Sequence, residues 1–281
     1  MKIGAMLESF RLPSKEAIEK TRQIGAKGLQ ISTVKGEFAP ENLSKSGRKD
    51  LLDFLTSYSL QISALCGDLG GHGFTKEEEN SWRIARTKEI IDLALDLRVN
   101  VVTTHIGVIP EDRKDARYET LQSAMKELGE YGDKKEVNLA IETGPETPEI
   151  LLEFIESLRV ESIKVNYDPA NLVMVTGVDP VKGVSTLGKY IVHTHAKDGI
   201  RISSISPEVI YDYFAEGGIG DIRLSDYFKE VPLGEGDVNF DDYIPALKNA
   251  GYDGFLTVER EVGENPVEDI ERAVEFLKRY I

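Results

Sequence analysis

Acidic and histidine side chains close four consecutive apolar segments in the second half of the chain. These segments end at Glu142, Asp168, His195 and Glu259. Each segment is short and rich in apolar residues, as a buried parallel β-strand is. If the strand ends meet, three carboxylates lie together and repel one another unless a cation neutralises them. Carboxylate oxygens and an imidazole nitrogen suit a divalent ion. The pattern therefore predicts one divalent metal ion, Mn²⁺ first, with Mg²⁺, Co²⁺ or Zn²⁺ as alternatives.

Each of these residues, taken alone, has a simpler explanation. An acid after a strand often caps the next helix, as Glu142 could do before Thr147 and Asp168 before Pro169. A single histidine such as His195 is more often a hydrogen-bonded core residue than a ligand. Only the coincidence of all four strand ends favours the metal site.

Eight strand-like runs alternate with segments of helical periodicity, which predicts a (β/α)₈ TIM barrel. An open, doubly wound sheet is the weaker alternative, because no glycine-rich nucleotide loop follows the first strand. In a barrel, the carboxyl ends of the strands converge on one face, where active sites lie. The predicted strands are Lys2–Met6, Gly28–Ser32, Leu60–Leu65, Asn100–His105, Val137–Glu142, Lys164–Asp168, Tyr190–His195 and Gly254–Glu259.

The helical segments between the strands supply the outer layer of the predicted barrel. Ser14 is expected to cap the first helix, and Trp82 is expected to lie in the core. The predicted helices are Ser14–Ile24, Lys49–Tyr58, Asn80–Leu97, Tyr118–Tyr131, Thr147–Leu158, Asp179–Leu187, Phe240–Ala250 and Pro266–Tyr280.

The length of 281 residues fits one TIM-barrel domain over residues 1–281. One irregularity is a long insertion at about 199–239, after the seventh strand. Loops this long are usually functional or contain short helices of their own. The insertion is expected to form a lid or wall over the site, with an oligomer contact as the alternative.

Composition narrows the classes of partner. The net charge is −15, from 34 basic and 49 acidic residues, so a nucleic-acid partner is not expected. No apolar run is long enough for a signal peptide or a membrane span. The single cysteine, Cys66, excludes an intrachain disulfide and fits a reducing compartment, so a cytoplasmic location is expected.

Further polar residues near the predicted strand ends are candidates for substrate contacts. His105 ends the fourth strand, and His72 lies in a glycine-rich loop after the third. Lys197 and Arg201 could neutralise a phosphate or carboxylate, although Lys197 could instead pair with a buried acid. Alternation along the seventh strand places His193 on the same face as His195, where it is expected to be a core or supporting residue.

Several stretches together resemble the xylose isomerase-like sugar phosphate isomerase/epimerase superfamily, which also includes AP endonucleases. The resemblance covers essentially the whole chain and implies a TIM barrel with one divalent metal ion held by Glu142, Asp168, His195 and Glu259. Dimers are common in such families, so a homodimer or homotetramer is one expectation. The stretches are Ala140–Glu142, Tyr167–Leu172, His193–Asp198, Pro232–Phe240 and Gly251–Glu259.

Within this superfamily, the ketose 3-epimerases of the tagatose/psicose type are the nearest functional model. They carry a substrate-binding arginine six residues after the ligand histidine, where this chain has Arg201. They also carry a histidine three residues after the ligand aspartate, where this chain has Asn171. The resemblance implies that Glu142 and Glu259 abstract and return a proton through an enediolate of a sugar or polyol, giving epimerisation or isomerisation.

Three other functions remain as alternatives. A dehydratase on the same scaffold, of the inosose or dehydroshikimate type, would expel water from the enolate. An AP endonuclease is disfavoured, because it needs more metal-binding histidines than the four present and a basic DNA face. A sugar-binding barrel without turnover is disfavoured by the presence of all four candidate ligands.

Overall fold

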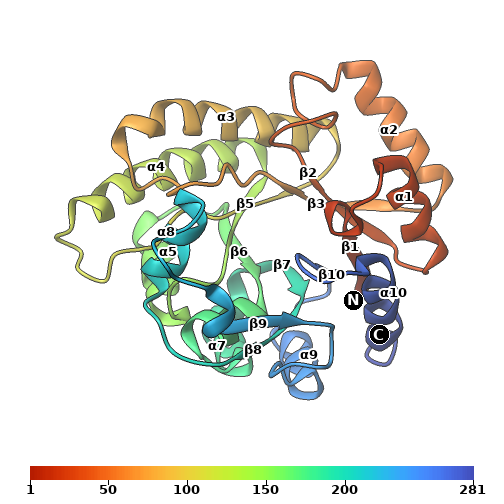
Figure 1. The fold of residues 1–281 in the computed structure, drawn as a ribbon. Helices are drawn as coiled ribbons and strands as arrows, with labels where there is room; N and C mark the ends of the chain where they lie inside the picture. The colour runs from red at the N-terminus through yellow and green to blue at the C-terminus, as the bar shows by residue number, and fades with distance from the viewer.

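The computed structural model describes all 281 residues and contains a closed barrel of eight parallel strands surrounded by helices (Figure 1). The barrel closes because β1 pairs with the last strand, β10. This confirms the predicted (β/α)₈ barrel over an open sheet. The barrel strands are β1 Lys2–Met6, β2 Gly28–Ser32, β3 Gln61–Cys66, β4 Val101–Thr104, β5 Asn138–Glu142, β6 Ile163–Tyr167, β7 Ile191–Ala196 and β10 Phe255–Val258.

Small boundary differences affect the residues of interest. Strand β4 ends at Thr104, so His105 lies just beyond the strand and not at its end. Asp168 and Glu259 likewise follow β6 and β10 by one residue. His195 lies inside β7, which continues to Ala196. His105, Asp168, His195 and Glu259 all still lie at the carboxyl end of the barrel.

Helices follow the barrel strands and cover their outer faces (Figure 1). At α5, the Thr147 side chain accepts a hydrogen bond from the Ile150 backbone N–H, and Pro148 takes the first helical position, as predicted. The helices are α1 Ser14–Gln23, α2 Lys45–Ser57, α3 Glu77–Asp96, α4 Ala116–Lys135, α5 Pro148–Leu158, α6 Pro169–Asn171, α7 Pro180–Leu187, α8 Pro207–Glu216, α9 Phe240–Asn249 and α10 Pro266–Leu277.

Two helix details were predicted wrongly. Ser14 is the first residue of α1 and not its cap, and its hydroxyl hydrogen-bonds to Glu37. Trp82 is 50% exposed, because it lies on the outer face of α3 beside the Arg83 guanidinium. None of the helices contains an apolar stretch that could span a lipid bilayer.

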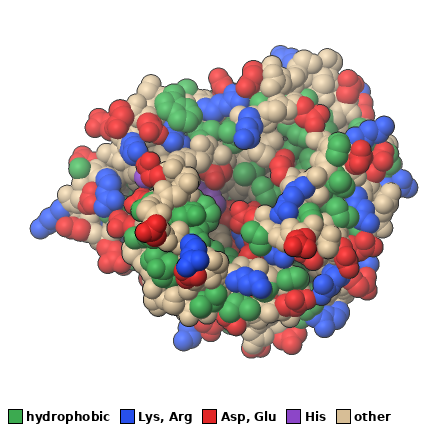
Figure 2. Space-filling model, in the orientation of Figure 1, with side chains coloured by type: hydrophobic (Ala, Val, Ile, Leu, Met, Phe, Trp, Pro, Cys, Tyr) green, Lys and Arg blue, Asp and Glu red, His purple; other side chains and the backbone are tan.

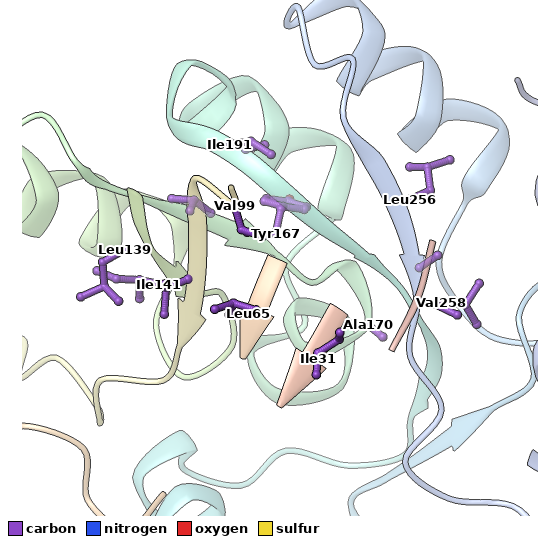
Figure 3. Packing of buried hydrophobic residues seen from close by; sticks show 14 of the residues in the cluster. Ile31, Leu65, Val99, Leu139, Ile141, Tyr167, Ala170, Ile191, Leu256 and Val258 are labelled. Atoms are coloured by element: carbon purple, nitrogen blue, oxygen red, sulfur yellow. The ribbon is translucent and has the colours of Figure 1, made fainter. Parts of the chain in front are cut away.

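The apolar core lies mainly between the strands and the helices, while the barrel interior is partly polar. Leu139 and Leu256 are among the fully buried side chains in this outer layer (Figure 3). Along β7, the Thr194 hydroxyl lies 2.6 Å from the Tyr243 hydroxyl of α9, on the outer side of the barrel. His193 therefore faces the interior with His195, as the alternation predicted.

The insertion after β7 contains regular structure. Strands β8 (Asp198–Arg201) and β9 (Phe228–Val231) form an antiparallel pair, and α8 lies between them in sequence (Figure 1). The Asp198 carboxylate accepts hydrogen bonds from the backbone N–H groups of Gly199, Gly234, Gly236 and Val238. This carboxylate therefore ties the return of the insertion to the end of β7.

Candidate metal centre and active site

Glu142, Asp168, His195 and Glu259 meet in one buried cluster at the carboxyl end of the barrel. One ligand atom from each residue lies within 4.8 Å of the others. Nδ1 of His195 is 3.2 Å from Oε2 of Glu259, 3.4 Å from Oδ2 of Asp168 and 3.6 Å from Oε1 of Glu142. The cluster has the donor set and compactness of a divalent-ion site.

The strand order explains why these four residues meet. Strands β10, β7, β6 and β5 are consecutive neighbours in the barrel, so their carboxyl ends lie side by side. Asp168 also caps α6, since its carboxylate accepts a hydrogen bond from the Asn171 backbone N–H at 2.8 Å. Helix capping and a place in the cluster are therefore compatible for this residue.

Neighbouring side chains hold the cluster residues in orientation. Nε2 of His195 lies 2.9 Å from the Gln30 side-chain oxygen, an acceptor, and 3.3 Å from the Asn166 amide nitrogen. We assign the proton to Nε2 because the Gln30 contact is the shorter of the two. Nδ1 then presents a lone pair to the carboxylates. Glu142 accepts hydrogen bonds of 3.0 Å from the side-chain amides of Asn166 and Asn171. This arrangement is typical of metal sites, whose ligands are oriented by surrounding hydrogen bonds.

The electrostatics of the cluster favour a bound cation. Burial by itself lowers the pKa of His195, but Glu259 and Glu142 outweigh burial and raise that pKa well above its usual value. Burial opposes ionisation of Glu259, yet His195 and Lys197 lower its pKa below the usual range. The centre therefore attracts positive charge, which a divalent ion supplies without protonating the imidazole.

Lys197 lies beside the cluster as a charge partner. Its side chain is 3% exposed, and Nζ donates to Oε2 of Glu259 at 3.1 Å and to Glu261. Burial lowers the pKa of Lys197, but Glu259 and Glu261 raise it well above its usual value. The structure thus places Lys197 against a buried acid, the second of its two expected roles.

His105 lies next to Glu142 in a chain of charged groups. Its Nδ1 is 3.1 Å from Oδ2 of Asp68, and its Nε2 is 3.6 Å from Oε1 of Glu142. Desolvation lowers the pKa of His105, but Glu142 and Asp68 raise it to about 10. Glu142 and Asp68 thus favour the imidazolium form of His105, whose ring lies beside the cluster.

The three remaining candidates for substrate contact differ in position. The Asn171 amide is occupied by Glu142 and by the Thr143 carbonyl, so it lies in the site as a support. The Arg201 guanidinium donates to the Thr176 carbonyl at 2.9 Å and to the Ser204 hydroxyl at 3.2 Å. It lines a separate surface cavity of about 520 Å³ and makes no contact with the cluster.

His72 lies at the edge of the site and contacts α8. Its Nε2 is 2.6 Å from Glu216, and its Nδ1 is 3.3 Å from Asp212. Both acids belong to α8, so His72 joins the glycine-rich loop after β3 to the insertion. The structure brings His72 to the wall of the site and not to the cluster.

Helix α8 forms part of the wall around the cluster. Its Tyr211 ring lies 5.9 Å from the His105 ring, between centroids. Histidine and acidic side chains are visible at the bottom of a depression near the middle of the face in Figure 2. The insertion therefore takes the wall position that was one of its two expected roles.

Gly144 should control how closely α8 packs against the turn after β5. A Cβ at this residue would lie 2.2 Å from the Tyr211 hydroxyl oxygen. Overpacking typically costs about 1–3 kcal/mol, so Gly144→Ala is expected to raise the open fraction of α8 about tenfold. Limited proteolysis within 199–239 measures this effect. Gly47→Ala is the control, because its Cβ would make only side-chain contacts of 3.3 Å with Leu43 and 3.4 Å with Ser44. Equal cleavage rates in both variants would contradict the prediction.

Sequence reasoning missed several residues of the site. Asp68 follows β3 by two residues, so its closeness to a strand end was a usable signal. Gln30 lies inside β2, where an amide in an apolar run hints at a polar barrel interior. Asn166 lies on the inner face of β6, two residues before Asp168. Tyr211 carries no comparable signal, because its place depends on how the insertion folds back.

Gln30 is expected to tune metal affinity through His195. Gln30→Leu removes the acceptor that fixes the imidazole, and loss of such a partner typically weakens metal binding about 10–100-fold. Isothermal titration with Mn²⁺ measures the change. Gln61→Leu is the matched control, since Gln61 is exposed and bonds only to Lys2. Mn²⁺ affinity within twofold of wild type in Gln30→Leu would contradict this role.

The fold and the buried cluster define a TIM-barrel protein of the xylose isomerase-like class. The sequence model of the xylose isomerase-like TIM barrel family matches residues 18–280, so the chain belongs to that family. A curated relative is the uncharacterized protein MJ1311 of Methanocaldococcus jannaschii. It is 25% identical over 254 residues, which cover 85% of this chain and 76% of the relative.

Three solved structures illustrate the range of similar barrels, and at this level of identity they show the fold alone. A D-tagatose 3-epimerase-like protein has a TM-score of 0.73 and 21% identity, covering 100% of this chain and 98% of that one. The probable 3-DHS dehydratase AsbF of Bacillus anthracis has a TM-score of 0.74 and 20% identity, covering 99% of each chain. The IOLI protein with a bound zinc atom has a TM-score of 0.74 and 18% identity, covering 100% and 99%.

Proposed function

We propose that the protein is a divalent-metal-dependent isomerase or epimerase acting on a sugar or polyol. The observation that carries this proposal is the cluster itself, in which the carboxylates of Glu142 and Glu259 flank one centre from different strands. Glu142, Asp168, His195 and Glu259 would hold the ion. When bound, the ion would polarise a substrate carbonyl and stabilise negative charge on its oxygen. Mn²⁺ is our first choice, and the zinc and magnesium bound to two similar barrels keep those ions as alternatives.

The two glutamates divide the proton transfer. One carboxylate accepts the proton from the carbon next to the carbonyl, and the other carboxyl group returns a proton from the opposite side. Return to the same carbon gives epimerisation, and return to the neighbouring carbon gives aldose–ketose isomerisation. Lys197 supports this scheme, because its ammonium contact keeps Glu259 in the ionised form, which is the form that can accept a proton.

Solvent-exchange NMR tests this proposal directly. The Mn²⁺-loaded protein is incubated in D₂O with a panel of ketoses and ketose phosphates, and Mn²⁺ is removed with chelator before the spectra are recorded. Deuterium at C3 would identify an epimerase, and deuterium at C1 or C2 an isomerase. Absence of exchange into every compound, with metal bound, would count against the two-glutamate scheme.

A dehydratase of the inosose or dehydroshikimate type is the second candidate. The specific observation in its favour is the Asp68–His105 pair, since a protonated His105 beside Glu142 could give its proton to a departing hydroxyl group. The similar fold of a probable 3-DHS dehydratase is consistent with this chemistry. Formation of an enone absorbance band without deuterium return would favour the dehydratase.

Domain organisation, partner class, location and oligomeric state are also matters of proposal. We propose a single catalytic unit over residues 1–281, acting on a small molecule and not on nucleic acid, because the net charge is −15. A cytoplasmic location and a homodimer or homotetramer remain proposals. Light scattering would establish the oligomeric state.

A further inference from the structure

Glu146 is a buried carboxyl group that the mechanism above does not use. It lies in the turn between β5 and α5, four residues after Glu142. The residue is 5% exposed, and neither carboxylate oxygen makes a hydrogen bond of normal distance and angle. The backbone N–H groups of Ile109 and of Glu146 itself lie near the carboxyl group and interact with it weakly. A buried acid with only weak partners costs stability, so a purely structural role does not explain it.

The surroundings of Glu146 belong to the site. The nearby His105 charge acts on Glu146, and Glu146 in turn acts on the Tyr211 hydroxyl together with Glu142 and Asp168. Tyr211 also approaches Gly144, in the same turn as Glu146. The hydroxyl of Tyr211 makes no hydrogen bond within the protein, so a second polar group without a hydrogen bond lies near Glu146.

Glu146 is an uncharged acid at neutral pH. Burial raises the pKa of its carboxyl group to about 8, and the positive charge of His105 opposes that rise only in part. A neutral carboxyl group can both donate and accept a hydrogen bond, as a phenol can. Such a pair of groups matches the hydroxyl groups of a sugar or polyol.

The cations near the site that could bind a phosphate are already paired within the protein. His105 is paired with Asp68 and Glu142. Lys197 is paired with Glu259 and Glu261, and Arg201 is bonded to Thr176 and Ser204. His72 is held by two acids of α8. A phosphate next to Glu146 would meet acidic groups and lose water without compensation.

We propose that Glu146 and Tyr211 form a neutral hydroxyl-binding subsite, which selects an uncharged polyhydroxylated substrate over its phosphorylated counterpart. The inference rests on the proposed function in one respect: the substrate reacts at the metal cluster. It assigns substrate choice to the turn after β5 and to α8, and not to Arg201.

The first test uses no substrate. Replacing Glu146 by Leu removes a buried acid, so Glu146→Leu is expected to keep Tm or raise it by about 2–4 °C. A structural role would instead lower Tm. Infrared difference spectra of wild type against Glu146→Gln should also show the carbonyl band of a protonated carboxyl group at neutral pH. A clear loss of Tm in Glu146→Leu, or absence of that band, would overturn the proposal.

The second test measures binding to the Mn²⁺-loaded full chain, using ketohexoses, their 6-phosphates and cyclic polyols as probes. Free compounds are expected to bind about tenfold more tightly than their phosphates. Glu146→Leu and Tyr211→Phe should each weaken that binding about tenfold, whereas Glu146→Gln, which still donates and accepts, should weaken it less. Glu149→Leu, an exposed acid nearby, is the matched control.

Binding outcomes separate this inference from the proposed function. Binding that depends on Glu146, without deuterium exchange, would support the subsite and contradict the two-glutamate chemistry. Equal or tighter binding of the phosphates would overturn the inference even if exchange occurs. Binding that is unchanged in Glu146→Leu, or absent for every probe, would overturn it as well.

Discussion

Glu259→Gln and Glu142→Gln are each expected to lower the rate of solvent-deuterium exchange into the substrate by about 10²–10⁴-fold. An amide cannot accept the proton that the carboxylate accepts, although its shape is nearly the same. The measurement is NMR exchange with whichever panel compound turns over, at saturating Mn²⁺. Metal occupancy is measured in parallel, so that lost proton transfer is distinguished from lost metal.

Glu261→Gln is the matched control for Glu259. Both glutamates contact Nζ of Lys197, but the Glu261 side chain is 62% exposed, whereas that of Glu259 is 8% exposed. An exposed ion pair contributes little, so Glu261→Gln should change the exchange rate only a few-fold. If Glu261→Gln impairs exchange as strongly as Glu259→Gln, the proton-transfer role belongs to the Lys197 network and not to Glu259 alone.

His195→Ala is expected to remove most of the stabilisation that Mn²⁺ gives to the fold. A ligand that binds only the folded state at about 100 times its Kd stabilises that state by about 2.7 kcal/mol. Loss of one of four ligands should weaken binding more than the 10–100-fold typical of an outer-shell partner, so the gain nearly vanishes. Thermal denaturation of each variant with Mn²⁺ and with chelator measures the difference.

His72→Ala serves as the control for this experiment. His72 bonds to Glu216 and Asp212 at the edge of the site, so its loss should leave the Mn²⁺-dependent rise in Tm unchanged. Comparing each variant with and without metal cancels any general destabilisation. A full Mn²⁺-dependent rise in His195→Ala would show that the cluster is not the metal site.

The strand-end residues illustrate what can be read without a structure. The identity of residues at the ends of apolar runs is a local property, so Glu142, Asp168, His195 and Glu259 could be singled out in advance. That these residues meet was a consequence of barrel closure, which the repeated alternation of strands and helices already indicated. The structure brings them together around Nδ1 of His195.

Other parts of the site depend on packing between distant segments. Gln30 reaches His195 across 165 residues of sequence, and Asp68 reaches His105 across 37. Arg201 has the spacing expected of a substrate contact, yet it ends β8, which pairs with β9, and its guanidinium donates to the Thr176 carbonyl. Side-chain direction in an insertion is decided by how that insertion folds back, which local periodicity does not encode.

The sequence by itself therefore determined the barrel, the four residues of the cluster and the acidic character of the protein. These features follow from apolar periodicity, residue identity and composition, which are local or additive. Only the tertiary structure decided which groups orient the cluster, which cations are already paired, and that the Glu146 carboxyl group is buried near Tyr211. Those properties depend on burial and on contacts between segments far apart in the chain, so they exist only once the barrel has closed.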